Sequence, residues 1–206
     1  MSKRWIAVAA GLAVIFASYE ATDHWHWLTP YVLPTTALDR LVPFVPGATP
    51  LYLSYFLFLP LVLFTLRDEA SFRRTLGAMV LAGAASAAVF FLWPTVLVRP
   101  HADGFLFGLV TSLDSGANCC PSQHVALACI AALGLRDDRS RWAAPGALWA
   151  AAICASTLLI KQHYVVDVAA GAALAAACFG LAGRSAVPSR SSAMSGEAPH
   201  PERAKT

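Results

Sequence analysis

Long apolar runs alternate with short polar stretches along this chain of 206 residues. Six apolar segments stand out, at about Trp5–Tyr19, Leu51–Leu66, Thr75–Val98, Val125–Leu135, Ala143–Ile160 and Val165–Gly183. A helix of roughly 20 apolar residues spans the hydrocarbon core of a bilayer. Several segments are shorter and need flanking residues, which is possible where headgroups or neighbouring helices cover their ends. The pattern predicts an all-α membrane bundle with about six transmembrane spans.

The composition supports lipid as the surrounding solvent. Hydrophobic residues make up 57% of the chain and charged residues 13%, against roughly 25% charged residues in an average soluble protein. The length suits one domain. We expect a membrane domain over residues 1–183 and a disordered cytoplasmic tail over residues 184–206, which is rich in Ser, Pro and Ala. The net charge of +3 is small and forms no basic stripe, so nucleic-acid binding is not expected.

Basic residues predict the orientation, because Lys and Arg in short loops favour the cytoplasm. Of the 15 Lys and Arg residues, 12 precede the first segment, follow the sixth, or lie in the second-to-third and fourth-to-fifth loops. The three on the opposite side are Arg40, Arg99 and Lys161. This distribution predicts six spans with both termini in the cytoplasm. In an alternative, the N-terminal segment is a cleaved secretory signal, and the remaining spans keep their orientation.

The five cysteines show neither metal-type spacing nor a disulfide pattern. Three lie inside apolar runs, where cysteine behaves as a small hydrophobic residue. Cys119 and Cys120 are neighbours in a loop and are read as small loop residues in preference to reactive thiols.

Unusual polar residues concentrate at the outer ends of the predicted spans. They occur in three stretches, Arg99-Pro100, residues 118–124 (NCCPSQH) and residues 156–167 (STLLIKQHYVVD). Ionisable residues at membrane boundaries are costly unless they have a function. Their occurrence on one side of the membrane therefore predicts a functional site there.

His163 and Asp167 are four residues apart, so they share a face if a helix begins near Lys161. A carboxylate bound to one imidazole nitrogen fixes the tautomer and leaves the other nitrogen free to attack an electrophile. The spacing therefore suggests an oriented histidine nucleophile. A helix-capping His and Asp pair is the structural alternative.

His124 follows Ser122 and Gln123 at the start of a predicted span, where backbone N–H groups and the helix dipole favour an anion. Ser122 adds a hydroxyl donor and Gln123 an amide, so we expect both to bind phosphate. A second histidine at this position can protonate a leaving alkoxide and later accept a proton from water. Arg99 and Lys161 are the cations available for phosphoryl oxygens. The set contains no carboxylate cluster of the kind that holds magnesium, and no metal or other cofactor is expected.

Together these residues resemble the phosphatidic acid phosphatase type 2 and haloperoxidase superfamily, whose motifs are KxxxxxxRP, PSGH and SRxxxxxHxxxD. The matching residues are Arg99-Pro100, then Pro121, Ser122, Gln123 and His124, then Ser156, His163 and Asp167. The resemblance covers roughly residues 92–171. It implies that His163 is the phosphohistidine-forming nucleophile, Asp167 its orienting partner and His124 the acid and base. It also implies that Arg99 and Ser122 bind phosphate.

Two motif positions depart from the family pattern. Leu92 stands where the family has Lys, and Thr157 stands where it has Arg. Lys161 lies four residues after Thr157, so we expect it to compensate as a phosphate-binding cation, with a snorkelling interface lysine as the alternative.

The resemblance implies a metal-independent lipid phosphatase of the cell membrane whose site faces the periplasm or extracellular space, acting on a lipid phosphate or diphosphate. Gln123 and the QHYVVD sequence are similar to the branch that contains inositol phosphorylceramide synthases. That similarity implies an alternative, a lipid phosphotransferase that uses an acceptor alcohol. A transporter or scaffold that has kept only the fold is a third possibility.

Overall fold

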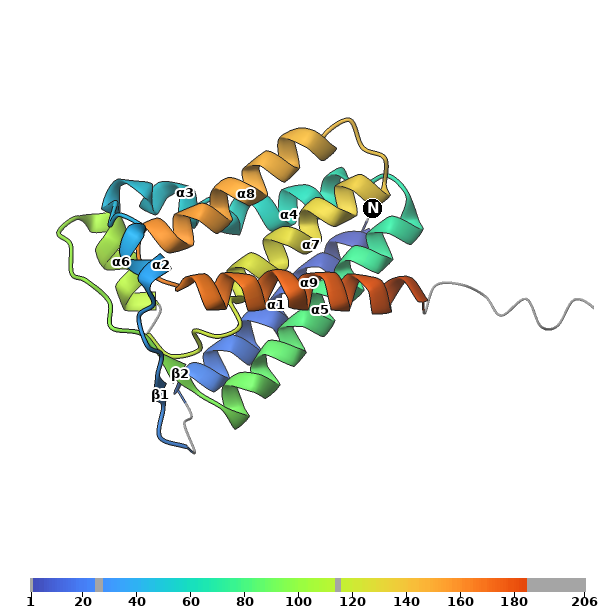
Figure 1. Ribbon diagram of the computed structural model, residues 1–206. Coiled ribbons are helices and arrows are strands. Elements are labelled where there is room, and N and C mark those ends of the chain that lie inside the picture. Colours follow the sequence, from blue (N-terminus) through green and yellow to red (C-terminus); the bar gives the residue numbers. More distant parts are fainter. Residues whose placement is uncertain (1, 25–27, 114–115, 185–206) are drawn as a thin grey trace, which may run out of the picture.

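The computed structural model describes residues 2–24, 28–113 and 116–184, and most of them are helical (Figure 1). The longer helices are α1 (Ser2–His24), α4 (Tyr55–Thr65), α5 (Glu69–Leu92), α7 (Gln123–Asp137), α8 (Ala143–Leu159) and α9 (Val165–Arg184). Shorter elements are β1 (Tyr31–Val32), α2 (Ala37–Leu41), the 3-10 helix η1 (Pro46–Ala48), α3 (Thr49–Leu53), β2 (Thr95–Val96) and α6 (Phe105–Leu113). The prediction of a helical protein is confirmed. Apart from Arg184, the predicted tail lies outside the described residues, and the domain division stays a prediction.

Each predicted apolar segment overlaps one of the longer helices, but the count of six spans is not confirmed. Within the described residues, four helical stretches are long and apolar enough to cross a membrane: Lys3–Asp23, Pro46–Thr65, Glu69–Leu92 and Val165–Gly183. The remaining two helices are shorter, with 15 residues in α7 and 17 in α8. Helix α7 packs against α4, α5, α8 and α9, so protein surrounds much of it and it depends less on contact with lipid.

The core lies around α7, between the long helices. Leu127, Ile130, Met79 and Leu63 are fully buried there. Large apolar side chains on outer helix faces are exposed instead, among them Trp5, Ile6, Phe56, Leu57, Leu61, Leu148, Val166 and Leu181. An apolar outer surface of this kind suits a protein that contacts lipid.

The third predicted segment ends earlier than expected. Helix α5 ends at Leu92, and the chain then forms β2, which pairs in parallel with β1. The extension of this helix to Val98 is wrong because Pro94 disfavours helical geometry in the residue before it and lacks an amide hydrogen. The short sheet ties the loop after α1 to the segment that leads to Arg99.

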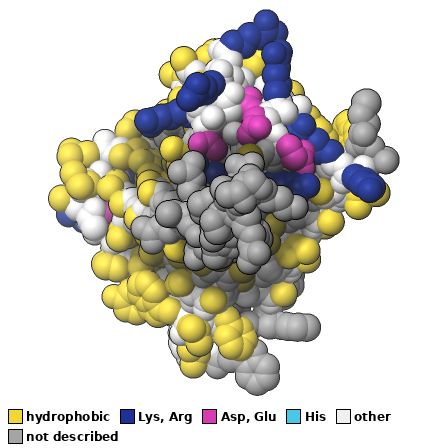
Figure 2. All heavy atoms as spheres, turned by 90° about the vertical axis from the view of Figure 1, so that its right-hand side faces the viewer, with side chains coloured by type: hydrophobic (Ala, Val, Ile, Leu, Met, Phe, Trp, Pro, Cys, Tyr) yellow, Lys and Arg dark blue, Asp and Glu magenta, His cyan; other side chains and the backbone are white. Residues whose placement is uncertain are grey.

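The two ends of the bundle differ in character. The N-terminus, the α4–α5 and α7–α8 connections and the end of α9 gather at one end (Figure 1). Figure 2 shows this end, where Lys and Arg side chains gather mainly in the upper and right parts of the view with Asp and Glu among them. Opposite charges pair at this end, where Arg74 forms an ion pair of 2.8 Å with Asp137. The short elements α2, α3 and α6 and the predicted site loops lie at the other end.

Helices α7 and α9 approach closely near their starts, at Gly171. A Cβ atom there would collide with the Ser122 carbonyl oxygen and would lie 3.1 Å from the Val125 Cβ. Backbone cannot move aside as a flexible side chain can. Glycine at this position therefore allows the two helices to meet.

We predict that Gly171→Ala destabilises the protein by about 1–3 kcal/mol through overpacking. Gly180→Ala, on the same helix, is the matched control because a Cβ there has nothing within 4 Å. The control is expected to be neutral or up to about 1 kcal/mol more stable, since alanine favours helix. Thermal unfolding in detergent, followed by tryptophan fluorescence, measures both. Equal unfolding midpoints for the two variants would contradict the close approach.

Candidate active site

The turn between α8 and α9 carries His163 and is a Schellman motif. The Gln162 backbone amide donates to the Thr157 carbonyl at 3.0 Å, and the Lys161 backbone amide donates to the Leu158 carbonyl at 3.1 Å. Lys161 has φ = 56°, the left-handed conformation that this position requires and that glycine usually supplies. The His163 amide also donates to the Thr157 carbonyl, at 3.2 Å. The end of α8 thus fixes the backbone of His163.

His163 and Asp167 lie side by side, as their spacing predicts, although α9 begins at Val165 and not near Lys161. Their Nδ1 and Oδ2 atoms are 3.7 Å apart, and the side chains are 4% and 0% exposed. Asp167 Oδ2 accepts a hydrogen bond of 2.7 Å from the Tyr164 amide. The carboxylate therefore caps α9 and faces the imidazole, so the capping alternative and the orienting role are compatible.

Three neighbouring buried side chains have polar atoms without hydrogen-bond partners among the described residues. These atoms are His163 Nδ1, Asp167 Oδ1 and both amide atoms of Gln162, a residue that is 0% exposed. Unpaired buried polar groups are rare and costly in folded proteins. Their concentration within six residues marks this turn as a place that water or a ligand completes.

The second motif begins α7 directly beside this turn. Ser122 is the N-cap of α7, and its hydroxyl accepts from the Val125 amide at 3.4 Å. The Ser122 amide donates to the Asp167 carbonyl at 3.0 Å, which joins the second and third motifs. Gln123, the first residue of α7, is 5% exposed. Ser122 is also buried, so these two of the four predicted phosphate ligands lie inside the protein.

Aromatic rings from α3 and α4 pack against the His124 ring. Its ring centroid is 4.5 Å from that of Tyr52, 4.4 Å from that of Tyr55 and 6.1 Å from that of His163. The Tyr52 hydroxyl lies 3.4 Å from His124 Nδ1. Sequence reasoning missed both tyrosines, because they belong to an apolar segment without a motif. Their spacing of three residues, which places them on one face of a helix, is the one sequence signal that could have identified them.

A mainly apolar pocket of about 240 Å³ adjoins His124. Its walls include Phe16 and Tyr19 of α1, Phe56 of α4 and Val110 of α6. Cleavage of the N-terminal segment as a signal peptide would therefore open this pocket.

The predicted cations differ in their placement. Arg99 lies beside the loop that leads into α7, with Nη2 4.0 Å from Cys119 Sγ. Lys161 Nζ donates to the backbone carbonyls of Asp39 and Val42, at 2.8 and 2.6 Å. The Lys161 ammonium thus donates to the loop around Asp39 and Val42, which weakens the expectation that Lys161 compensates for the missing phosphate cations.

The two departing motif positions also differ from each other. Leu92, the last residue of α5, is 69% exposed, whereas Thr157 is fully buried in α8. The Thr157 hydroxyl donates to the Cys154 carbonyl at 2.8 Å. An arginine at position 157 would therefore need space that this packing does not offer.

Cys120 is a protonated thiol near neutral pH. Burial and the nearby Asp167 carboxylate raise its pKa to about 11. Because the thiolate is the nucleophilic form, this environment favours the reading of Cys120 as a small loop residue.

Within the described ranges, no group of three or more His, Cys, Asp or Glu side chains is arranged to hold a metal ion. Metal independence stays a prediction, because this concerns side-chain placement and not activity.

The structure is a helical bundle with apolar outer faces, and two histidines lie beside a buried carboxylate at one of its ends. The family model of the PAP2 superfamily matches residues 23–181, and the chain belongs to this superfamily. Membership supports a phosphatase or phosphotransferase activity on lipid phosphates in general. No curated protein and no solved structure matches the chain.

We predict that Tyr52→Phe lowers the turnover of a lipid phosphate by about 2- to 10-fold, the effect of losing one ordinary hydrogen bond. The ring that stacks on His124 is kept, so the hydroxyl alone is tested. Tyr31→Phe is the matched control, because Tyr31 lies half-exposed on β1. Steady-state release of phosphate from purified protein measures both variants. Equal turnover in the two would exclude a role for the Tyr52 hydroxyl.

Proposed function

We propose that this protein is a lipid phosphatase that forms a phosphohistidine at the outer membrane face without a metal ion. The observation that carries the proposal is the convergence of His163, Asp167 and His124. One imidazole faces a buried carboxylate at 3.7 Å, and the second imidazole lies 6.1 Å from the first. That arrangement supplies an oriented nucleophile and a separate acid and base.

In the first step, His163 Nε2 attacks the phosphorus atom while Nδ1 faces Asp167. A nitrogen–phosphorus bond forms and the bond from phosphorus to the lipid oxygen breaks. His124 donates a proton to the leaving oxygen, and Asp167 stabilises the positive charge on the His163 ring. The 3.7 Å separation is expected to shorten on substrate binding, because catalytic hydrogen bonds are often long in unliganded enzymes.

In the second step, His124 accepts a proton from water. The water oxygen then attacks phosphorus, the nitrogen–phosphorus bond breaks and inorganic phosphate leaves. Both imidazoles return to their starting protonation states, so the cycle balances.

Phosphate contacts are proposed for Arg99, for Ser122 and Gln123 at the start of α7, and for the side-chain amide of Gln162. The Gln162 side chain is included because it is fully buried and both its polar atoms lack partners among the described residues. Preorganised donors of this kind stabilise charge that develops on phosphoryl oxygens.

The proposed substrate is a lipid phosphate or diphosphate from the bilayer. Support comes from the apolar pocket beside His124, which suits the hydrocarbon of a lipid alcohol.

We further propose a cell-membrane protein with six spans and both termini in the cytoplasm. In this proposed topology α7 and α8 are the two shorter spans, and neighbouring helices surround their ends. No nucleic acid takes part in the proposed function.

A lipid phosphotransferase that uses the same residues is the second candidate. The surroundings of His124 favour it, since Tyr52, Tyr55 and Phe56 enclose a pocket with mainly apolar walls. An organic alcohol would enter such a pocket more readily than water. Its hydroxyl would take the place of water in the second step. Assays with and without an acceptor alcohol separate the candidates by their products, free phosphate or a new phospholipid.

We predict that His163→Ala lowers turnover by about a thousandfold or more, because the covalent route requires this imidazole. His101→Ala is the matched control, since its side chain is 88% exposed in an outer loop. The wild-type protein, quenched during turnover, is expected to hold phosphate that survives base and is released by acid. Turnover in His163→Ala equal to that of the control would refute the proposed nucleophile.

We predict that an impermeant thiol reagent applied to intact cells labels Asp103→Cys and does not label Arg136→Cys. Both positions are exposed, and they lie in the proposed outer and inner loops. The variants are made in a background in which the five native cysteines are replaced. Labelling of position 136 with protection of position 103 would invert the orientation and move the site to the cytoplasmic face.

A further inference from the structure

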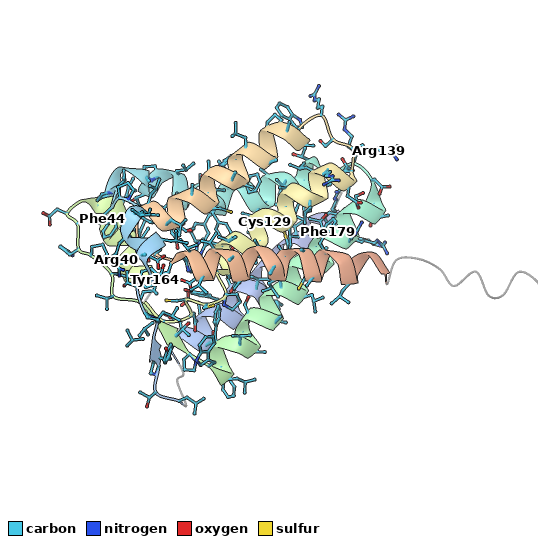
Figure 3. All side chains as sticks on the ribbon, in the orientation of Figure 1. Arg40, Phe44, Cys129, Arg139, Tyr164 and Phe179 are labelled. Atoms are coloured by element: carbon cyan, nitrogen blue, oxygen red, sulfur yellow. The ribbon has the colours of Figure 1, made fainter. Side chains whose placement is uncertain are left out.

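An outer segment of the chain is bound directly to the turn that carries His163. We define residues 35–45 as the outer clasp. Its contacts with the turn are Val45 N to Leu159 O at 2.8 Å, Lys161 Nζ to Asp39 O and Val42 O at 2.8 and 2.6 Å, Val165 N to Asp39 Oδ1 at 2.8 Å, and Thr35 Oγ1 with the Tyr164 hydroxyl at 2.9 Å. These contacts reach residues on both sides of His163. Figure 3 shows Arg40 and Phe44 of the clasp near Tyr164, at the same end of the bundle.

Asp39 is the centre of the clasp and is 3% exposed. One carboxylate oxygen accepts from the Thr36 amide at 2.8 Å, and the other accepts from the Val165 amide at the start of α9. Burial raises the pKa of Asp39, but the bonds from Thr36 and Val165 and the charge of Lys161 outweigh it and hold the pKa below its usual value. The carboxylate is therefore charged at neutral pH, as both bonds require.

Lys161 occupies a backbone position that would favour glycine. A side chain at φ = 56° is strained relative to glycine. The ammonium of Lys161 donates to two backbone carbonyls of the clasp, a contact that glycine could not make. The strained backbone turns the chain toward His163, and the side chain fixes that turn to the outer loop.

From these contacts we propose that Asp39 and Lys161 are positioning residues that hold the His163 turn in its reactive geometry. This inference rests on the proposed function of His163. The His163 Nδ1 atom has no hydrogen-bond partner in the described part of the chain, and its separation from Asp167 is 3.7 Å. Its ring is therefore placed mainly through the backbone of the turn, which the clasp holds from both sides.

Two variants test the clasp, one at Asp39 in the clasp itself and one at Lys161 in the turn that it contacts. In Asp39→Asn, one oxygen becomes an NH2 group that cannot accept from a backbone amide, so one of the two bonds is lost. In Lys161→Gly, the backbone strain is relieved while the contacts to Asp39 and Val42 disappear. Each variant is expected to lower kcat by about 10- to 100-fold, the effect of a misplaced reacting group, with little change in KM.

The chain offers a close control for each variant. Helix α7 ends in the same Schellman arrangement, with Ser140 N bonded to Leu135 O at 3.0 Å and Arg139 at φ = 50°. Arg139 is exposed and lies at the far end of the bundle from the clasp (Figure 3). Arg139→Gly therefore relieves the same strain away from the site, and Asp103→Asn repeats the amide substitution on an exposed outer loop. Both controls are expected to keep wild-type kcat.

Hydrogen exchange gives a readout that does not depend on activity. Peptides covering residues 158–168 are expected to exchange faster in Asp39→Asn and Lys161→Gly than in the controls, because the Val165 amide and the turn lose their support. Thermal unfolding is measured in parallel, and Lys161→Gly is expected to remain folded.

The outcomes separate the possibilities. Unchanged exchange in residues 158–168 overturns the clasp, even if the wild-type protein proves inactive on lipid phosphates. Faster exchange with unchanged kcat shows a structural contact only and refutes the positioning role. A rise in KM confined to Lys161→Gly, with normal Asp39→Asn, makes Lys161 a phosphate ligand instead. Failure of the proposed function itself is read separately, from wild-type protein and His163→Ala.

Discussion

The hydrogen bond from the Ser122 amide to the Asp167 carbonyl joins the starts of α7 and α9, and the rest of the site depends on it. It is possible because Gly171 lets the two backbones meet without a side chain between them. Ser122 leads into His124, and Asp167 lies beside His163. This backbone contact, together with the packing of α7 against α9, places the two histidine-bearing segments side by side although they are far apart in the sequence.

The site also depends on its position at one end of the bundle. Buried polar groups such as the Gln162 side-chain amide and the Asp167 carboxylate would be costly in the hydrocarbon region without partners. Here the Tyr164 backbone amide supplies a partner to Asp167, and the Asp39 carboxylate accepts from the Val165 backbone amide. Among the described residues, both polar atoms of the Gln162 side chain and one oxygen of Asp167 remain for water or substrate. Lys161, at φ = 56° in that turn, donates from its side chain to backbone carbonyls of Asp39 and Val42.

Sequence patterns predicted the helices well and their ends less well. Apolar runs located all six long helices, because burial and lipid contact both select apolar residues. They did not separate a helix enclosed by protein, such as α7, from one that faces lipid. The helix end at Leu92 was missed because Trp93, Val96 and Val98 continue the apolar run past Pro94. The pairing of β1 with β2 was missed because it joins segments more than 60 positions apart.

The sequence by itself determined the family, because the types and spacing of the motif residues carry it, and it singled out the two histidines and Asp167 as candidate site residues. It also predicted that His163 and Asp167 lie together, since four residues make about one helical turn, although His163 lies in the turn before α9 and not on the helix. Only the tertiary structure decided what surrounds them. Tyr52 reaches His124 from another helix, and Asp39 and Lys161 meet across more than 100 residues. Such contacts depend on how the helices pack, and no local pattern encodes them.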